Sequence, residues 1–90
     1  EIRKKNPNFI NLCLNKVLTL PVSFENLKRL SSLNIQDNSL TEIPTSILKL
    51  KELTYLNVSS NKLKSLPNNL KEFTNLMHLN ISSNMVAYTL

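Results

Sequence analysis

Cys13 and His78 are the two side chains of this 90-residue chain that could pair as a nucleophile and a general base. The chain has one cysteine and one histidine, so no second pair of this kind exists. It also contains no glycine, the residue that a phosphate-cradling loop needs where the backbone approaches its ligand. Whether Cys13 and His78 can meet depends on the elements that carry them.

Those elements belong to a repeat of 23 residues. Asparagine and proline recur at this interval, and the apolar residues between them keep the same spacing. The recurring residues are Asn15, Asn38, Asn61 and Asn84, and Pro21, Pro44 and Pro67. A period of this length is typical of a solenoid, in which each unit buries its apolar face against the next.

Each unit predicts a short strand followed by a helical turn. In the second unit Leu33 and Ile35 alternate with polar residues, which is the pattern of a strand with one buried face. Beyond Pro44, the spacing of Ile47 and Leu50 fits one turn of α- or 3-10 helix that packs both inward. Parallel strands joined in this way wind right-handedly. The recurring asparagines are expected to stack as a ladder inside the bend, where their amides satisfy main-chain groups.

This arrangement separates Cys13 from His78. They belong to the first and fourth strands, so three strand spacings, about 14 Å in all, lie between them. At this distance the two side chains cannot form a hydrogen bond. One cysteine and one histidine also cannot build a zinc site of the usual kind. Acidic residues do not pair on the predicted concave face either. We therefore expect no catalytic residue, no cofactor and no metal, and a role other than that of an enzyme.

The apolar pattern resembles the leucine-rich repeat family, whose consensus is Leu-x-x-Leu-x-Leu-x-x-Asn-x-Leu. Three segments match it in register, namely 30–40, 53–63 and 76–86, the last with valine at the final position. The unit length and the pairs Leu20-Pro21, Ile43-Pro44 and Leu66-Pro67 are similar to those of Ras-suppressor-like and bacterial members of the family. The resemblance covers roughly residues 9 to 86.

The resemblance implies an α/β fold, a right-handed leucine-rich repeat solenoid shaped as a short horseshoe. A parallel sheet lines its concave face, and 3-10 or short helical turns form its convex face. We expect residues 1–8 to form a leader or partial cap and residues 9–90 to form about four repeats, the last incomplete. Pro7 replaces a leucine of the pattern and residues 87–90 lack the apolar-proline pair, so neither end has a recognisable cap. Such ends predict either a fragment of a longer array or self-association.

Strand residues that point away from the core are expected to form rows along the concave face. The residues that we assign to a partner-binding surface are Phe9, Asn11, Asn34, Gln36, Tyr55, Asn57, Ser59, His78 and Asn80. One row has asparagine in all four units. It has two interpretations: hydrogen bonding between adjacent side chains with copying of the repeat, or a polar strip that binds a peptide or loop. Tyr55, at the centre, is expected to contribute most to binding.

The resemblance implies a non-catalytic module that binds a protein or peptide through the concave face, with no small-molecule substrate. The alternatives are the recognition part of a larger enzyme or signalling protein and, with less support, nucleic-acid binding. The net charge of +5 is scattered rather than gathered in a stripe, which disfavours nucleic acid. No apolar run is long enough to span a membrane. The sequence does not distinguish a cytoplasmic protein from a secreted one whose signal has been removed.

Overall fold

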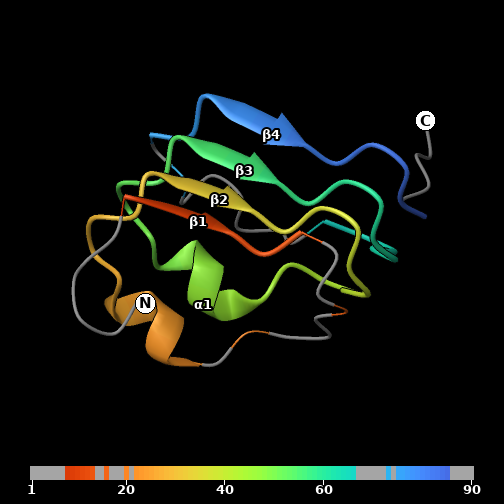
Figure 1. Cartoon of the computed structure of the whole chain (residues 1–90), viewed down its shortest axis with the longest axis horizontal. Helices are drawn as coiled ribbons and strands as arrows, with labels where there is room; N and C mark the ends of the chain where they lie inside the picture. The colour runs from red at the N-terminus through yellow and green to blue at the C-terminus, as the bar shows by residue number, and fades with distance from the viewer. Residues whose placement is uncertain are drawn as a thin grey trace.

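A single parallel sheet organises the chain. The computed structural model describes residues 8–13, 16, 20, 22–66, 73 and 75–85. Four strands lie side by side in chain order within them: β1 (Phe9–Asn11), β2 (Ser32–Asn34), β3 (Tyr55–Asn57) and β4 (His78–Asn80) (Figure 1). All three pairs are parallel, and the register joins residues 23 apart, such as Ile10 with Leu33 and Leu33 with Leu56. The predicted solenoid of parallel strands is confirmed.

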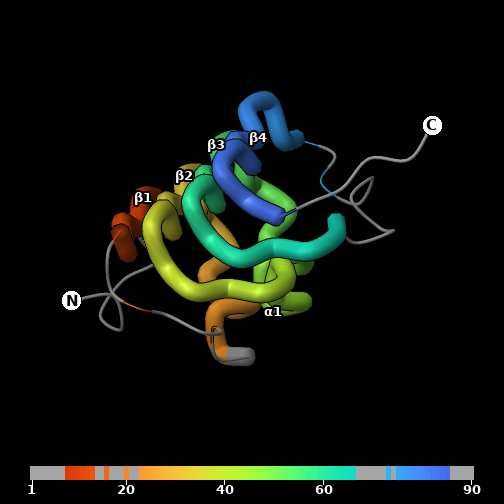
Figure 2. The backbone as a smooth tube through the Cα atoms, turned by 90° about the vertical axis from the view of Figure 1, so that its right-hand side faces the viewer, coloured from red at the N-terminus to blue at the C-terminus, as the bar shows by residue number. Residues whose placement is uncertain are grey.

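Short helical segments lie across the core from the strands. They are the 3-10 helix η2 (Val22–Asn26) and the α-helix α1 (Thr45–Leu48), which occupy equivalent places in successive coils and pack against each other. Figure 2 shows the coils following one another from β1 to β4, with α1 on the side away from the strands. α1 begins directly after Pro44, whose ψ of 143° keeps it extended. The single helical turn predicted beyond this proline is confirmed.

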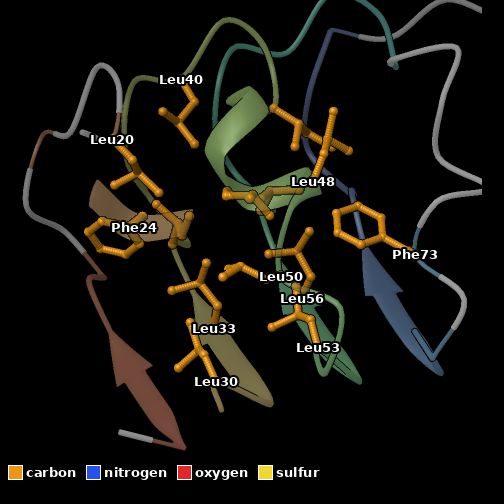
Figure 3. Close-up of a cluster of buried hydrophobic side chains, with 14 of the residues drawn as sticks. Leu20, Phe24, Leu30, Leu33, Leu40, Leu48, Leu50, Leu53, Leu56 and Phe73 are labelled. Carbon is orange, nitrogen blue, oxygen red and sulfur yellow. The ribbon is translucent and has the colours of Figure 1, made fainter. Parts of the chain in front are cut away.

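The core fills the space between the sheet and the helical segments and is almost entirely aliphatic (Figure 3). Ile47 and Leu50 are buried on the helical side, as predicted. Other fully buried side chains come in equivalent sets from successive coils: Leu30 and Leu53, Leu33 and Leu56, Ile35 and Val58, Leu40 and Leu63. Burying one such side chain stabilises by about 1.5–3 kcal/mol. The core is therefore one continuous cluster built from repeated layers, to which successive coils contribute equivalent side chains.

Burial falls at the last strand. Leu79 and Ile81 are only partly buried, whereas the equivalent Leu56 and Val58 are completely buried. The reason is that β4 is the final strand of the described sheet, so no further described coil covers its layer. Pro7 and residues 87–90 lie outside the described residues. The domain boundaries and the self-association of uncapped ends stay predictions.

Three bends share a residue in the left-handed conformation. Asp37, Ser60 and Ser83 recur at the repeat interval with φ of 58°, 54° and 55°. The N–H of Ser60 donates to the carbonyl oxygen of Ser82 in the next coil at 2.9 Å. This conformation costs a residue other than glycine about 1–2 kcal/mol. The chain has no glycine to adopt this conformation without the cost. Contacts between the stacked coils must therefore offset it.

Ser60→Gly is expected to raise the free energy of unfolding by about 1 kcal/mol, because glycine adopts this φ without a Cβ clash and keeps the N–H. The matched control is Ser23→Gly in η2, which lies outside the left-handed set. There the same change should lower stability by about 0.5 kcal/mol. Urea unfolding followed by circular dichroism measures both. Destabilisation by Ser60→Gly would show that the bend carries no strain.

Ser46 in α1 is buried, with 4% of its surface exposed, and its hydroxyl has no hydrogen-bond partner among the described residues. A buried hydroxyl without a partner costs about 1–3 kcal/mol. Ser46→Ala is therefore expected to raise the free energy of unfolding by about 1 kcal/mol. Thr45→Ala, at an exposed position of the same helix, controls for the change in helix propensity. Thermal unfolding compares the two, and equal effects would contradict the prediction.

Candidate functional site

The sheet presents one face to the core and one to solvent, and we call the second the outer sheet face. It is the face that the sequence predicts to be concave. The register aligns two rows on it: Phe9, Ser32, Tyr55 and His78, then Asn11, Asn34, Asn57 and Asn80. The same spacing continues two residues further in a third row of Cys13, Gln36, Ser59 and Ser82. None of these three rows contains a Lys, Arg, Asp or Glu side chain.

The first row carries the aromatic side chains. Phe9 is 57% exposed, Tyr55 is partly buried and His78 is exposed. The ring centroids of Tyr55 and His78 lie 6.4 Å apart with the planes inclined by 52°, which is within the range of favourable aromatic pairs. Ser32 on β2 lies between Phe9 and this pair. The row thus offers a ring pair on β3 and β4 and a separate exposed ring on β1.

The asparagines of the second row are held by hydrogen bonds along the chain. In each of them Oδ1 accepts the backbone N–H two residues further on, which caps the end of the strand. The distances are 2.9 Å for Asn11 to Cys13 and 3.0 Å for Asn34 to Gln36, Asn57 to Ser59 and Asn80 to Ser82. One interpretation expects hydrogen bonds between adjacent side chains on this face, and a bond of this kind joins Asn57 to Gln36 of the preceding coil.

Burial divides the residues that the sequence assigned to partner binding. Asn57 and Ser59 are 6% and 3% exposed. Asn57 has a strand on each side, and its Nδ2 donates to Oε1 of Gln36 at 3.3 Å. The members that meet solvent are Phe9, Asn11, Asn34, Gln36, Tyr55, His78 and Asn80. These seven side chains, six from the four strands and Gln36 from the segment directly after β2, form the candidate surface.

The repeated asparagine of each unit lies inside the bend that follows the strand. Nδ2 of Asn61 donates to Ile35 O of the preceding coil at 2.9 Å. It also donates within its own coil to Val58 O at 3.0 Å and to Ser59 O at 3.1 Å. Its Oδ1 accepts the N–H of Leu40 at 3.0 Å. One buried amide thus joins two coils through four hydrogen bonds.

The equivalent asparagines repeat this geometry. Asn38 donates to Leu12 O of the preceding coil at 2.8 Å, and Asn84 donates to Val58 O at 2.9 Å. Both also donate to two carbonyls of their own coil. Asn15, the first predicted member, lies outside the described residues. The ladder of Asn38, Asn61 and Asn84 therefore runs through the described bends.

Two exposed methionines adjoin the surface and were not among the predicted site residues. Met77 is 75% exposed directly before β4, and Met85 is 60% exposed in the bend after it. At the equivalent positions one unit earlier the chain has Thr54 and Lys62. The sequence could have indicated both methionines, because each is apolar at a position that is polar in the preceding repeat. The two methionines add exposed apolar side chains beside β4.

The structure keeps the two potentially catalytic side chains apart. Cys13 follows β1 and His78 opens β4, with β2 and β3 between them. Across the described ranges, no three His, Cys, Asp or Glu residues cluster in a way that could hold a metal ion. In that same part of the chain, no helix has the length and apolar character needed to cross a membrane.

Coils of one strand each, closed by short helical turns and joined by a buried asparagine ladder, define a solenoid of the leucine-rich type. The family model for leucine-rich repeats matches residues 28–86. The chain belongs to the leucine-rich repeat family, as its sequence pattern indicated. Members of this family are typically protein-interaction modules and generally non-catalytic.

Two solved bacterial structures are similar to the chain. A leucine-rich repeat protein of Leptospira interrogans is 36% identical, with a TM-score of 0.71 over 77% of this chain and 18% of that one. An internalin of Listeria monocytogenes, InlF, is 31% identical, with a TM-score of 0.66 over 79% of this chain and 20% of that one. The chain thus spans about a fifth of the length of either protein. No curated protein sequence matches it.

Asn61→Ala is expected to lower the free energy of unfolding by about 3 kcal/mol, because the buried N–H of Leu40 loses its partner and three carbonyls of two coils each lose one hydrogen bond. Asn61→Asp should also destabilise strongly, since a carboxylate cannot donate to the three carbonyls. Asn80→Ala, which removes only the two local exposed bonds from Ser82, should cost about 1 kcal/mol. Denaturant unfolding of the three variants measures the difference. If Asn61→Ala and Asn80→Ala lower the free energy of unfolding equally, the asparagine ladder stabilises the fold no more than an exposed strand cap does.

Proposed function

We propose that the chain is a non-catalytic protein-interaction module that binds a protein or peptide through the outer sheet face. The observation that carries this proposal is the register of the strands, which gathers exposed polar and aromatic side chains of four coils on one face. The large aliphatic side chains lie on the other face, in the core. The general role of the family supports the same conclusion.

The arrangement of the exposed side chains suits protein recognition. Tyr55 and His78 offer a ring pair, and aromatic residues are enriched among those that dominate binding energy at interfaces. Around the rings stand carboxamides, which can hydrogen-bond to a peptide backbone. Asn57 and Ser59 are not included in the proposed contact set, because their side chains are covered and hold the end of β3.

The rival functions have less support. An intrinsic enzyme would need a nucleophile and a base within hydrogen-bond reach, and Cys13 and His78 are on opposite edges of the sheet. Recognition on behalf of a larger protein is compatible with the same surface, since the similar bacterial structures are much longer. Nucleic-acid binding would place cations on the contact face, and the three outer rows have neither lysine nor arginine.

Tyr55→Ala is expected to weaken partner binding at least tenfold, because it removes the ring at the centre of the surface. The chain is immobilised, captured proteins are identified by mass spectrometry, and the best candidate is titrated by calorimetry against both forms. Thr45→Ala in α1, on the helical side, is the matched control and should leave binding unchanged. Circular dichroism verifies that both variants are folded.

The opposite pattern would overturn the proposed function. Partners lost with Thr45→Ala and retained with Tyr55→Ala would place the contact on the helical side. Titration with a DNA duplex tests the nucleic-acid rival, which predicts binding that falls steeply between about 50 and 200 mM salt.

A further inference from the structure

The exposed carboxamides of the outer sheet face all turn the same atom toward solvent. The backbone N–H that caps each strand is a donor, so the atom that it meets must be the amide oxygen. This requirement fixes the orientation of Asn11, Asn34 and Asn80, whose Oδ1 atoms accept at 2.9–3.0 Å. Their Nδ2 groups therefore point away from the backbone that the oxygens cap.

Gln36 reaches the same polarity through a different bond. Its Oε1 accepts Nδ2 of Asn57 at 3.3 Å, which leaves its own Nε2 for an outside acceptor. Asn57 has both ends of its amide occupied, because its Oδ1 accepts from Ser59. The central asparagine is thus internal to the surface, and the groups around it present donors.

The oxygens are occupied while the nitrogens are not. Oδ1 of Asn80 accepts a second bond, from the hydroxyl of Ser82 at 2.8 Å. By contrast, the amide nitrogens of Asn11, Asn34, Gln36 and Asn80 have no hydrogen-bond partner in the structure of the described residues. We call these four residues the donor strip. An amide nitrogen only donates, so its partner must supply acceptors.

Charge around the strip favours an anionic partner. The loops after β1 and β3 carry the exposed cations Lys16, Lys62 and Lys64. The loop after β2 carries two carboxylates, the partly exposed Asp37 and the exposed Glu42, so the described residues of these three loops carry three cations and two carboxylates. A carboxylate is an acceptor without donors, and hydrogen bonds to an ionised group are about twice as strong as those between neutral groups. Carboxylate oxygens therefore complement both the donors and the surrounding charge.

We propose that the donor strip binds an acidic peptide segment through its carboxylate and carbonyl oxygens. The proposal rests on the proposed function of the outer sheet face and specifies the chemistry of the partner. A peptide is favoured over another polyanion because the rings of Tyr55 and His78 adjoin the strip and offer an apolar contact for its side chains.

The test uses a fluorescein-labelled ten-residue peptide of alternating Asp and Ala, and a matched peptide with Asn in place of Asp. Binding to the chain is followed by fluorescence anisotropy. The double variant Asn11→Ser, Asn80→Ser removes two donors without changing net charge. A serine hydroxyl can still accept the N–H two residues on, so the strand ends keep their caps. The wild-type chain is expected to bind the Asp peptide more tightly than the Asn peptide. The double variant is expected to bind the Asp peptide about tenfold more weakly than the wild-type chain does.

Asn26→Ser, at an exposed position of η2 on the helical side, is the matched control and should change the affinity less than twofold. Should the double variant unfold, Asn80→Asp replaces it, because an aspartate keeps the capping oxygen and repels the peptide. Its effect is compared with that of Asn26→Asp, which changes net charge equally. A larger loss at position 80 supports the strip.

Three results would overturn the proposal. They are unchanged binding of the Asp peptide by the donor-deficient variant, equal binding of the two peptides, and stronger competition by polygalacturonate than by the Asp peptide. If a captured partner is lost with Tyr55→Ala but kept by the double serine variant, the interaction surface stands and the donor strip fails. If both Tyr55→Ala and the double serine variant keep the captured partner, the proposed function itself is rejected.

Discussion

In each of the described bends, one asparagine carboxamide joins two successive coils. The bend after each strand contains carbonyl and N–H groups that neither sheet nor helix pairs, and burying them without partners would cost about 1–3 kcal/mol each. Asn61 satisfies three carbonyls and one N–H at once, in two different coils. Only an amide side chain has the two donated hydrogens and the acceptor in one short group. The repeated asparagine therefore sets the spacing of the coils as well as the shape of the bend.

The outer sheet face is a consequence of that spacing. Because each ladder residue fixes its coil against the preceding one, Tyr55 is opposite His78, and Asn11 is aligned with Asn34. A shift of one residue in any strand would exchange its core and solvent faces. The core layers prevent such a shift, since Leu33 and Leu56 would then leave the interior. The same bonds and layers that stabilise the chain thus define its exposed rows.

The sequence predicted what depends on the period alone. Comparing equivalent residues of successive repeats is enough to predict the strands and their register. It also predicts the helical turn after Pro44 and the burial of Ile47. The period does not reveal what differs within one coil. The burial of Asn57 depends on its amide reaching Gln36, and the left-handed Ser60 is not signalled in a chain without glycine. The orientation of each outer asparagine amide depends on the position of a backbone N–H, which the sequence does not reveal.

The two asparagine sets use the same side chain in two different hydrogen-bonding arrangements. In the bend, both ends of the Asn61 amide are occupied, so the group is entirely structural. At the strand ends, capping occupies only the oxygen of Asn34, and the nitrogen remains. The proposed recognition therefore does not compete with structure at these residues, since the bond that orders the side chain also orients its donor. Because that orientation is fixed in advance, a partner that supplies acceptors has little side-chain freedom to remove when it binds.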